Sequence, residues 1–158
     1  MVKEQKGQTL IETALILTLL LLILLGISEF ARAWYMKNSL KNGVRQGARV
    51  AAVTPRSSLP ANFTCDNNTD CSNASLNPII RAVCCQPGIP RKAAPETTSV
   101  TLTCIDSVTN NVIPCSTNIT SNDTVQVRAN TTFFTIVHSF SPWLRDITIT
   151  TDASMRYE

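Results

Sequence analysis

Six cysteines and a single histidine are the side chains of this sequence that could carry covalent or metal chemistry. The cysteines all lie in a part of the chain rich in Thr, Asn and Ser: Cys65, Cys71, Cys84, Cys85, Cys104 and Cys115. An even number of cysteines in a polar segment is typical of disulfides formed in an oxidising compartment. A metal site is the alternative, but no C-x-x-C pair occurs and His138 is the lone histidine. We therefore expect disulfides, and neither a metal ion nor a cofactor.

The spacing of the cysteines favours some disulfide pairings over others but does not determine them. Cys104 and Cys115 lie on either side of a segment whose Thr109-Asn110-Asn111 suits a hairpin turn, so they could face each other. Cys84 and Cys85 are adjacent, and a disulfide between neighbours would be strained. We expect them to reach separately to Cys65 and Cys71. From sequence alone, all the pairings of six cysteines remain open.

A carboxylate at the start of an apolar run is the second candidate for chemistry. Leu10 to Ile27 contains Glu12 and is otherwise uncharged, and a bilayer-spanning helix needs about 20 apolar residues. A carboxylate in the bilayer centre costs about 2.5–3.5 kcal/mol, and less near its edge. Glu12 could simply lie among the headgroups. Alternatively, a protease that cut after Gly7 would leave a new amine at Gln8, and the amine of a neighbouring subunit could pair with Glu12.

The helical pattern continues well past the apolar run, because no proline occurs before Pro55. Apolar residues recur at steps of three and four from Ala33 to Ala51, the stripe of an amphipathic helix. Gly43, Gly47 and Ala51 repeat every four residues, and such small residues let another helix approach closely. We predict one helix over residues 8–53, with about 10–27 in a membrane. Its predicted partners are other helices of the same kind.

The N-terminal stretch GQTLIETALILTLLLLILLGISEFARAWYMKNSLKNGVRQGARVAAV resembles the opening of TadE-like proteins. These are pilin-like components of tight-adherence (Tad, Flp-type) pilus systems, with the class III signal of type IV pilins. The ending TTDASMRYE is also similar to that family. The resemblance implies that residues 1–7 are a leader, that a prepilin peptidase cuts between Gly7 and Gln8, and that Glu12 is needed for processing or assembly. The main Flp pilins are tiny and carry Tyr where Thr13 stands here, which implies a minor subunit.

Two signals disagree on which side of the membrane the C-terminal part lies. The leader carries Lys3 and Lys6, whereas five basic residues follow the apolar run: Arg32, Lys37, Lys41, Arg45 and Arg49. By the positive-inside rule this places the C-terminal side in the cytoplasm. The cysteines favour the opposite side, and the leader resemblance supports them. We therefore expect a single-pass protein of a bacterial inner membrane with its C-terminal domain outside the cytoplasm, free to enter an extracellular pilus.

The remaining residues, 54–158, are predicted to form an exported domain of an α+β protein. The segment around Cys65 and Cys71 is rich in Pro, Asn, Asp and Ser and indicates a loop. A short helix is expected between Asn77-Pro78 and Pro87-Gly88. Alternating β-branched residues predict strands near 99–105, 122–137 and 145–157. We expect a small antiparallel sheet of three or four strands, packed against the membrane-distal half of the helix.

No residues of this sequence form a catalytic constellation, and its charge argues against a nucleic-acid partner. The net charge is +3 and the basic residues are scattered. We interpret His138 and the apolar stretch around it as core, with a docking patch as the alternative for that stretch. Six Asn-x-Ser/Thr triplets are interpreted as chance in a chain so rich in Asn and Thr: Asn62, Asn67, Asn73, Asn118, Asn122 and Asn130.

The sequence thus favours a non-enzymatic, pilin-like subunit of a Tad-type apparatus, with no small-molecule substrate. The rival hypothesis is a signal-anchored periplasmic or surface binding protein or adhesin. It predicts an intact leader, and it predicts that Gly43 and Gly47 tolerate bulky substitution.

Overall fold

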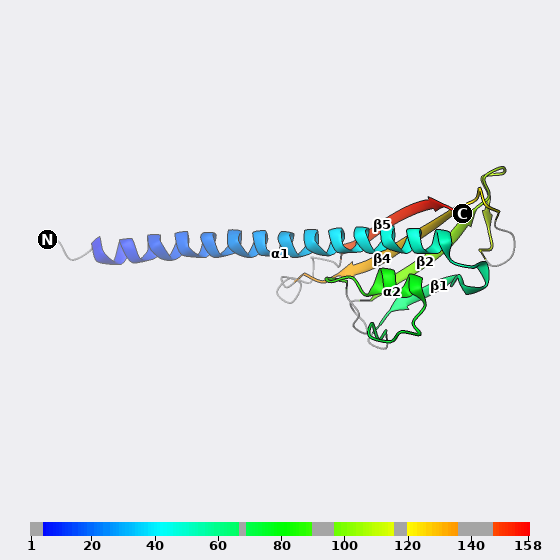
Figure 1. Cartoon of the computed structure of the whole chain (residues 1–158). Helices are drawn as coiled ribbons and strands as arrows, with labels where there is room; N and C mark the ends of the chain where they lie inside the picture. Colours follow the sequence, from blue (N-terminus) through cyan, green and yellow to red (C-terminus); the bar gives the residue numbers. More distant parts are fainter. Residues whose placement is uncertain (1–4, 67–68, 90–96, 116–119, 136–146) are drawn as a thin grey trace. The chain divides into compact units, whose positions relative to one another are not determined.

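The computed structural model describes residues 5–66, 69–89, 97–115, 120–135 and 147–158 (Figure 1). Two compact units divide the chain, Met1–Trp34 and Tyr35–Glu158. Helix α1 (Gln5–Val53) begins in the first unit and ends in the second. His138, Asn67 and Asn118 lie outside the described residues, as does most of the apolar stretch that contains His138.

Helix α1 ends where the sequence predicts. It runs without interruption to Val53, and Pro55 follows, whose ring cannot continue a helix. The last turn is closed by Thr54, whose hydroxyl donates to the carbonyl oxygen of Val50 at 2.6 Å. A short 3₁₀ turn, η1 (Arg56–Ser58), then reverses the chain.

The second unit contains an antiparallel sheet of five strands (Figure 1). Its central path runs β1 (Asn62–Cys65), β2 (Thr98–Ile105), β4 (Thr124–Phe133) and β5 (Ile147–Arg156). The short β3 (Val112–Ile113) pairs with the end of β2. The predicted α+β class with a small antiparallel sheet is confirmed.

Strand β1 corrects the prediction of an uninterrupted loop in that segment, and with β3 it raises the strand count above the predicted three or four. Local composition favours a loop there, but Phe63 pairs with Val100 and Cys65 with Thr98 on β2. Pairing to an existing strand, together with the burial of Cys65, outweighs the turn-forming residues around it. Tertiary contacts override local propensity at this place.

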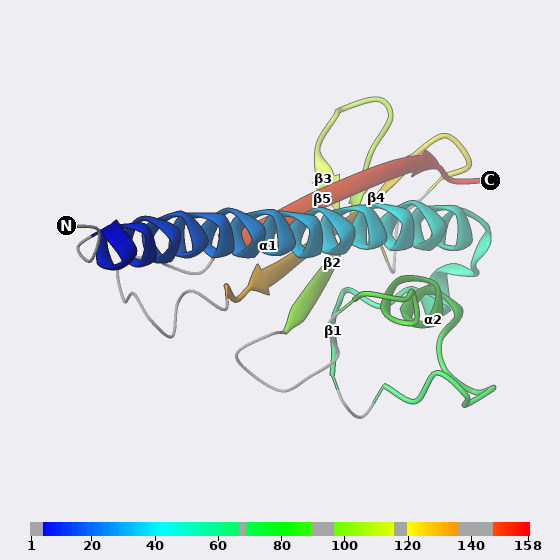
Figure 2. The ribbon, with the colours of Figure 1, turned by 90° about the vertical axis from the view of Figure 1, so that its left-hand side faces the viewer.

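One face of the sheet packs on the second half of α1, as predicted (Figure 2). Alternate residues of β4 are buried, among them Val125, Val127 and Ala129. The residues of α1 in the same core recur at steps of three and four: Leu40, Val44, Ala48 and Ala51. A fully buried Leu or Val side chain contributes about 1.5–3 kcal/mol. The amphipathic stripe of α1 therefore holds the domain to its helix.

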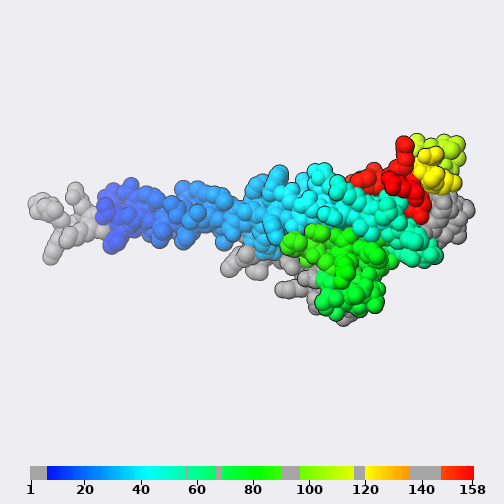
Figure 3. Space-filling view, in the orientation of Figure 1, coloured from blue at the N-terminus to red at the C-terminus, as the bar shows by residue number. Residues whose placement is uncertain are grey.

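The small-residue track of α1 lies against α2 (Pro78–Cys84), a helix of the same chain (Figure 3). A Cβ added at Gly43 would lie 3.0 Å from the carbonyl oxygen of Val83. At Gly47 it would lie 2.4 Å from Cγ2 of Val83, which is too close for real atoms. Ala51, the third residue of the track, is fully buried in the core. The helix that packs closely against these small residues is thus α2 of the same domain.

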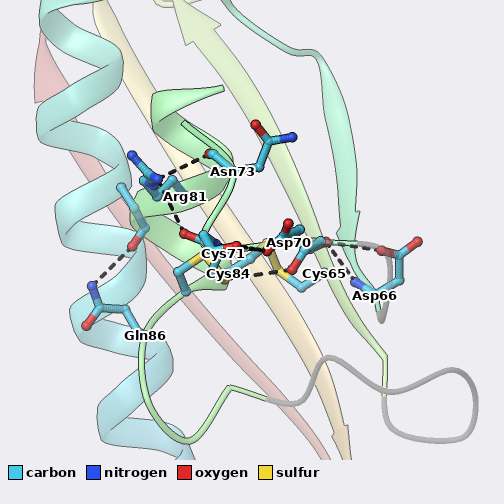
Figure 4. Close-up of a disulfide and its surroundings, with 12 residues drawn as sticks. Cys65, Asp66, Asp70, Cys71, Asn73, Arg81, Cys84 and Gln86 are labelled. Atoms are coloured by element: carbon cyan, nitrogen blue, oxygen red, sulfur yellow. Dashed lines mark hydrogen bonds between the residues drawn. A yellow bond between two sulfur atoms is a disulfide. The ribbon is translucent and has the colours of Figure 1, made fainter. Parts of the chain in front are cut away.

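Three disulfides brace the second unit, and all six cysteines take part. Cys65 pairs with Cys84 and Cys71 with Cys85, so the adjacent cysteines reach separately to Cys65 and Cys71, as predicted. Cys65 ends β1 and Cys71 lies in the loop after it, and Figure 4 shows both beside Cys84. Cys104 pairs with Cys115 across the hairpin of β2 and β3, also as predicted. Asn110 occupies the left-handed conformation in that turn, which Asn adopts readily. The first two bridges attach β1 and its loop to α2.

The C-terminus closes the end of α1. The backbone N–H of Glu158 donates to the carbonyl oxygen of Ala52, and the hydroxyl of Tyr157 to that of Thr54, each at 3.1 Å. The last carbonyls of a helix have no partner within it, so these bonds satisfy them from outside. The N–H of Tyr157 donates to the carbonyl oxygen of Asp123 at 2.7 Å. The end of the chain is thereby fixed between α1 and the β4 side of the sheet.

Asp123 is a buried carboxylate that organises the loops beside that C-terminal contact. Its oxygens accept from the backbone N–H of Thr120 at 2.6 Å and of Ser107 at 3.0 Å. Those backbone donors, Thr120 first, hold the pKa of Asp123 below its ordinary value of 3.8. Folding therefore favours the ionised form, and its stabilisation is present above the ordinary pKa and lost as pH falls through the lowered one.

We predict that Gly47→Leu destabilises the second unit by about 1–3 kcal/mol, because the new side chain collides with Val83. Thermal unfolding of the full chain in detergent micelles measures the change. Gly26→Leu is the matched control, since nothing lies within 4 Å of a Cβ at Gly26. Equal melting temperatures for the two variants would contradict the observed packing.

We predict that Asp123→Asn lowers the melting temperature at neutral pH. We also predict that the melting temperature of this variant decreases less when the pH is lowered into the acid range. In the natural chain the temperature should drop below about pH 4, as the Asp123 carboxylate is protonated. The melting temperature of the variant should still depend partly on pH in acid, because hydrogen bonds also lower the pKa values of Asp70 and Asp106. Asp152→Asn, on the exposed side of β5, is the control. An unchanged acid slope in Asp123→Asn would refute this role.

Candidate functional site

The candidate site is the N-terminal part of α1, where the predicted processing residues lie. Gly7, Gln8 and Glu12 are all exposed on this helix, on one face with Ile11 and Leu15. The helix begins at Gln5, so the peptide bond between Gly7 and Gln8 lies in its first turns. Helix ends fray, and glycine costs a helix about 1 kcal/mol relative to alanine. The predicted cleavage point is therefore at a weak end of α1.

The apolar part of α1 presents its side chains outward around the whole helix. The helix satisfies the length and composition of a membrane span, with a mean hydropathy of 2.7 over its most apolar window and none of that window buried. Leu and Ile side chains from Leu10 to Ile27 are exposed, so no described residue of the first unit covers them. A helix that is apolar all round and uncovered in its own unit requires an apolar environment.

The polar side chains within this apolar run are satisfied by the helix itself. The hydroxyl of Thr13 donates to the carbonyl oxygens of Thr9 and Leu10, at 2.9 and 3.0 Å. The hydroxyl of Thr18 donates to the carbonyl oxygen of Ala14 at 2.8 Å. Internal bonds of this kind remove the cost of placing a hydroxyl in lipid. Glu12 is then the one ionisable side chain of the run from Leu10 to Ile27.

An aromatic pair just after the apolar run was missed by the sequence analysis. The rings of Phe30 and Trp34 stack with their centroids 5.9 Å apart, and both side chains are exposed. Aromatic residues, Trp above all, gather where a membrane span meets water. Their spacing of four residues, directly beyond the last Leu and Ile, was a signal available in the sequence. The pair marks the end of the apolar segment.

The remaining predicted site residues lie in the second unit. Gly43, Gly47 and Ala51 contact the chain's own domain. A bulky side chain at Gly43 or Gly47 would therefore disturb that domain whatever its function is. Tolerance at these two positions does not separate the pilin-like hypothesis from the anchored binding protein, contrary to the expectation above.

The comparisons with known proteins agree with this description of α1. A family model described as TadE-like protein matches residues 7–49, which begin at the predicted cleavage point and stay within α1. No curated protein and no solved structure matches the chain. The predicted resemblance is therefore confirmed for this part of the chain: its N-terminal segment is TadE-like.

Proposed function

We propose that this protein is a non-enzymatic, pilin-like subunit that takes part in the assembly or structure of a Tad-type pilus. The observation that carries the proposal is the TadE-like match over residues 7–49, which coincides with an exposed apolar helix. In this role the apolar segment holds the subunit in a bacterial inner membrane until it joins neighbouring pilin-like subunits. The second unit is then the part that the apparatus displays.

The three disulfides support a location of the second unit outside the cytoplasm. Cytosolic thiols are kept reduced, whereas the bacterial periplasm is oxidising. A domain with all six cysteines paired suits the latter compartment. The basic residues after the span favour the opposite side by the positive-inside rule. We give the disulfides more weight, because a pilin-type leader would direct export independently of that charge bias.

Processing is the next step of the proposal. A prepilin peptidase removes residues 1–7 and leaves Gln8 as the new N-terminus. Its ammonium then lies four residues from Glu12, on the helix face that both share. In an apolar surrounding a lone carboxylate is costly, and pairing with a cation offsets that cost. The amine of an adjacent subunit is the proposed partner of Glu12.

We predict that the protein purified from membranes lacks residues 1–7, and that this loss depends on the prepilin peptidase. Intact mass spectrometry of the chain from strains with and without the peptidase measures it. Gly7→Leu should block the cut, because the pilin-type leader that this segment resembles has a glycine directly before the cut. A full-length chain in both strains would instead support the anchored binding protein or adhesin.

We predict that Glu12→Ala leaves membrane insertion intact and abolishes piliation. Removing the carboxylate makes insertion less costly, but it also removes the partner for the neighbouring amine. Membrane fractionation and electron microscopy of surface pili test the two parts. Thr18→Ala is the matched control, because that hydroxyl bonds only within its own helix turn in the described structure. Normal pili on Glu12→Ala cells would remove the proposed pairing.

A further inference from the structure

The outer face of the second half of α1 carries only one sign of charge. The side chains exposed on this helix after Met36 and before Val53 are all basic or amide: Lys37, Asn38, Lys41, Asn42, Arg45, Gln46 and Arg49. The opposite face is buried against the sheet and α2. In the space-filling view this part of α1 is open to the viewer between β5 and α2 (Figure 3). We call these seven side chains the basic face.

The charges of the basic face are not balanced within the helix. After Glu29, α1 contains neither Asp nor Glu. A solvated helix usually carries acids four residues from its bases, whereas Lys41, Arg45 and Arg49 repel one another at that spacing. Within the described part of the chain, none of these three cations forms an ion pair. Lys41, Arg45 and Arg49 are therefore available to pair with carboxylates of another chain.

A second copy of this chain is poorly suited to supply those carboxylates. Two basic faces repel each other. Among the acids of the second unit that the structure describes, five accept internal hydrogen bonds: Asp66 from Thr69, Asp70 from Ser72, Asp106 from Val108, Asp123 from Thr120 and Asp152 from Gln126. The sixth, Glu158, follows β5 beside the C-terminal end of α1. None of these six acids lies on a helix, so they do not form a row that matches the helical repeat of the cations.

We propose that the basic face binds an acidic helix of a different subunit of the same apparatus. The inference rests on the proposed function and deepens it by naming the chemistry of a partner. The cations recur every four residues, and Lys41 to Arg49 cover about 12 Å at 1.5 Å per residue. Carboxylates with the same repeat on a neighbouring helix would meet each cation in turn, whereas a loop acid would meet only one. Like-charge repulsion would disfavour self-assembly through this face.

Photo-crosslinking of the full chain in its own bacterial membranes tests this inference. A benzoylphenylalanine in place of Gln46 puts the probe in the middle of the basic face, and the same probe in place of the exposed Thr150 on β5 is the control. We expect an adduct from position 46 whose crosslinked peptide, identified by mass spectrometry, comes from another protein. That peptide should carry Asp or Glu at four-residue spacing.

Charge variants make the test specific. Combined Lys41→Glu, Arg45→Glu and Arg49→Glu should lower the adduct yield at least about tenfold, because like charges then face each other. Combined Lys41→Arg, Arg45→Lys and Arg49→Lys should keep it. Nonreducing gels confirm that the three disulfides are intact in both variants.

Several results would overturn the inference: no adduct, an adduct with lipid alone or with a second copy of this chain, or an unchanged yield after charge reversal. The intact mass of the crosslinked chain is read in the same samples. If the N-terminus is processed and one of these results is found, only the proposed binding of an acidic helix by the basic face is refuted. If the N-terminus is unprocessed, the proposed function itself is refuted.

Discussion

Close packing of residues 36–52 of α1 against the sheet and α2 is the contact on which the second unit depends. The sheet has a single apolar face, and α1 supplies the surface that covers it. Gly43 and Gly47 bring α2 so near that a methyl group would not fit at Gly47. Glycine lowers the stability of a helix interior, but here it permits the burial of Val83 and Ile89. The helix therefore gives up some intrinsic stability and gains tertiary contact.

The rest of the domain is polar for its size, and covalent bonds compensate for its modest core. Cys65–Cys84 and Cys71–Cys85 tie β1 and a loop rich in Asn and Asp to α2. The four-residue β1 would be a weak edge strand without that attachment. At the other end, Tyr157 and Glu158 close the last turn of α1, and Asp123 holds two loops by their backbone N–H groups. The C-terminal end of α1 and the last residues of the chain are thus fixed together.

Different faces and segments of α1 make different contacts. The buried face of its second half belongs to the domain. In the proposed function, this face is therefore not available to neighbouring subunits. In that role, contacts with neighbouring subunits fall to the apolar segment from Leu10 to Ile27 and to the basic face. The TadE-like match covers both of these parts, since it runs from residue 7 to 49. In the proposed function, the subunit keeps its domain folded while its helix moves from lipid to contact with other subunits.

The sequence by itself determined the features that depend on local pattern. Hydrophobic periodicity and the absence of proline before Pro55 predicted α1, and alternation predicted the long strands. Spacing favoured the Cys104–Cys115 bridge and separate partners for Cys84 and Cys85, but only the folded chain decided that Cys84 pairs with Cys65 and Cys85 with Cys71. Turn-rich composition concealed β1, because strand pairing with β2 is a nonlocal contact that outweighs propensity. The sequence also did not show which helix packs against Gly43 and Gly47. A repeat of small residues indicates a close approach, but it does not identify the element that approaches. Nothing in the sequence distinguishes Asp123 from the other acids predicted to lie in loops, because only the folded backbone directs the N–H groups of Ser107 and Thr120 toward it.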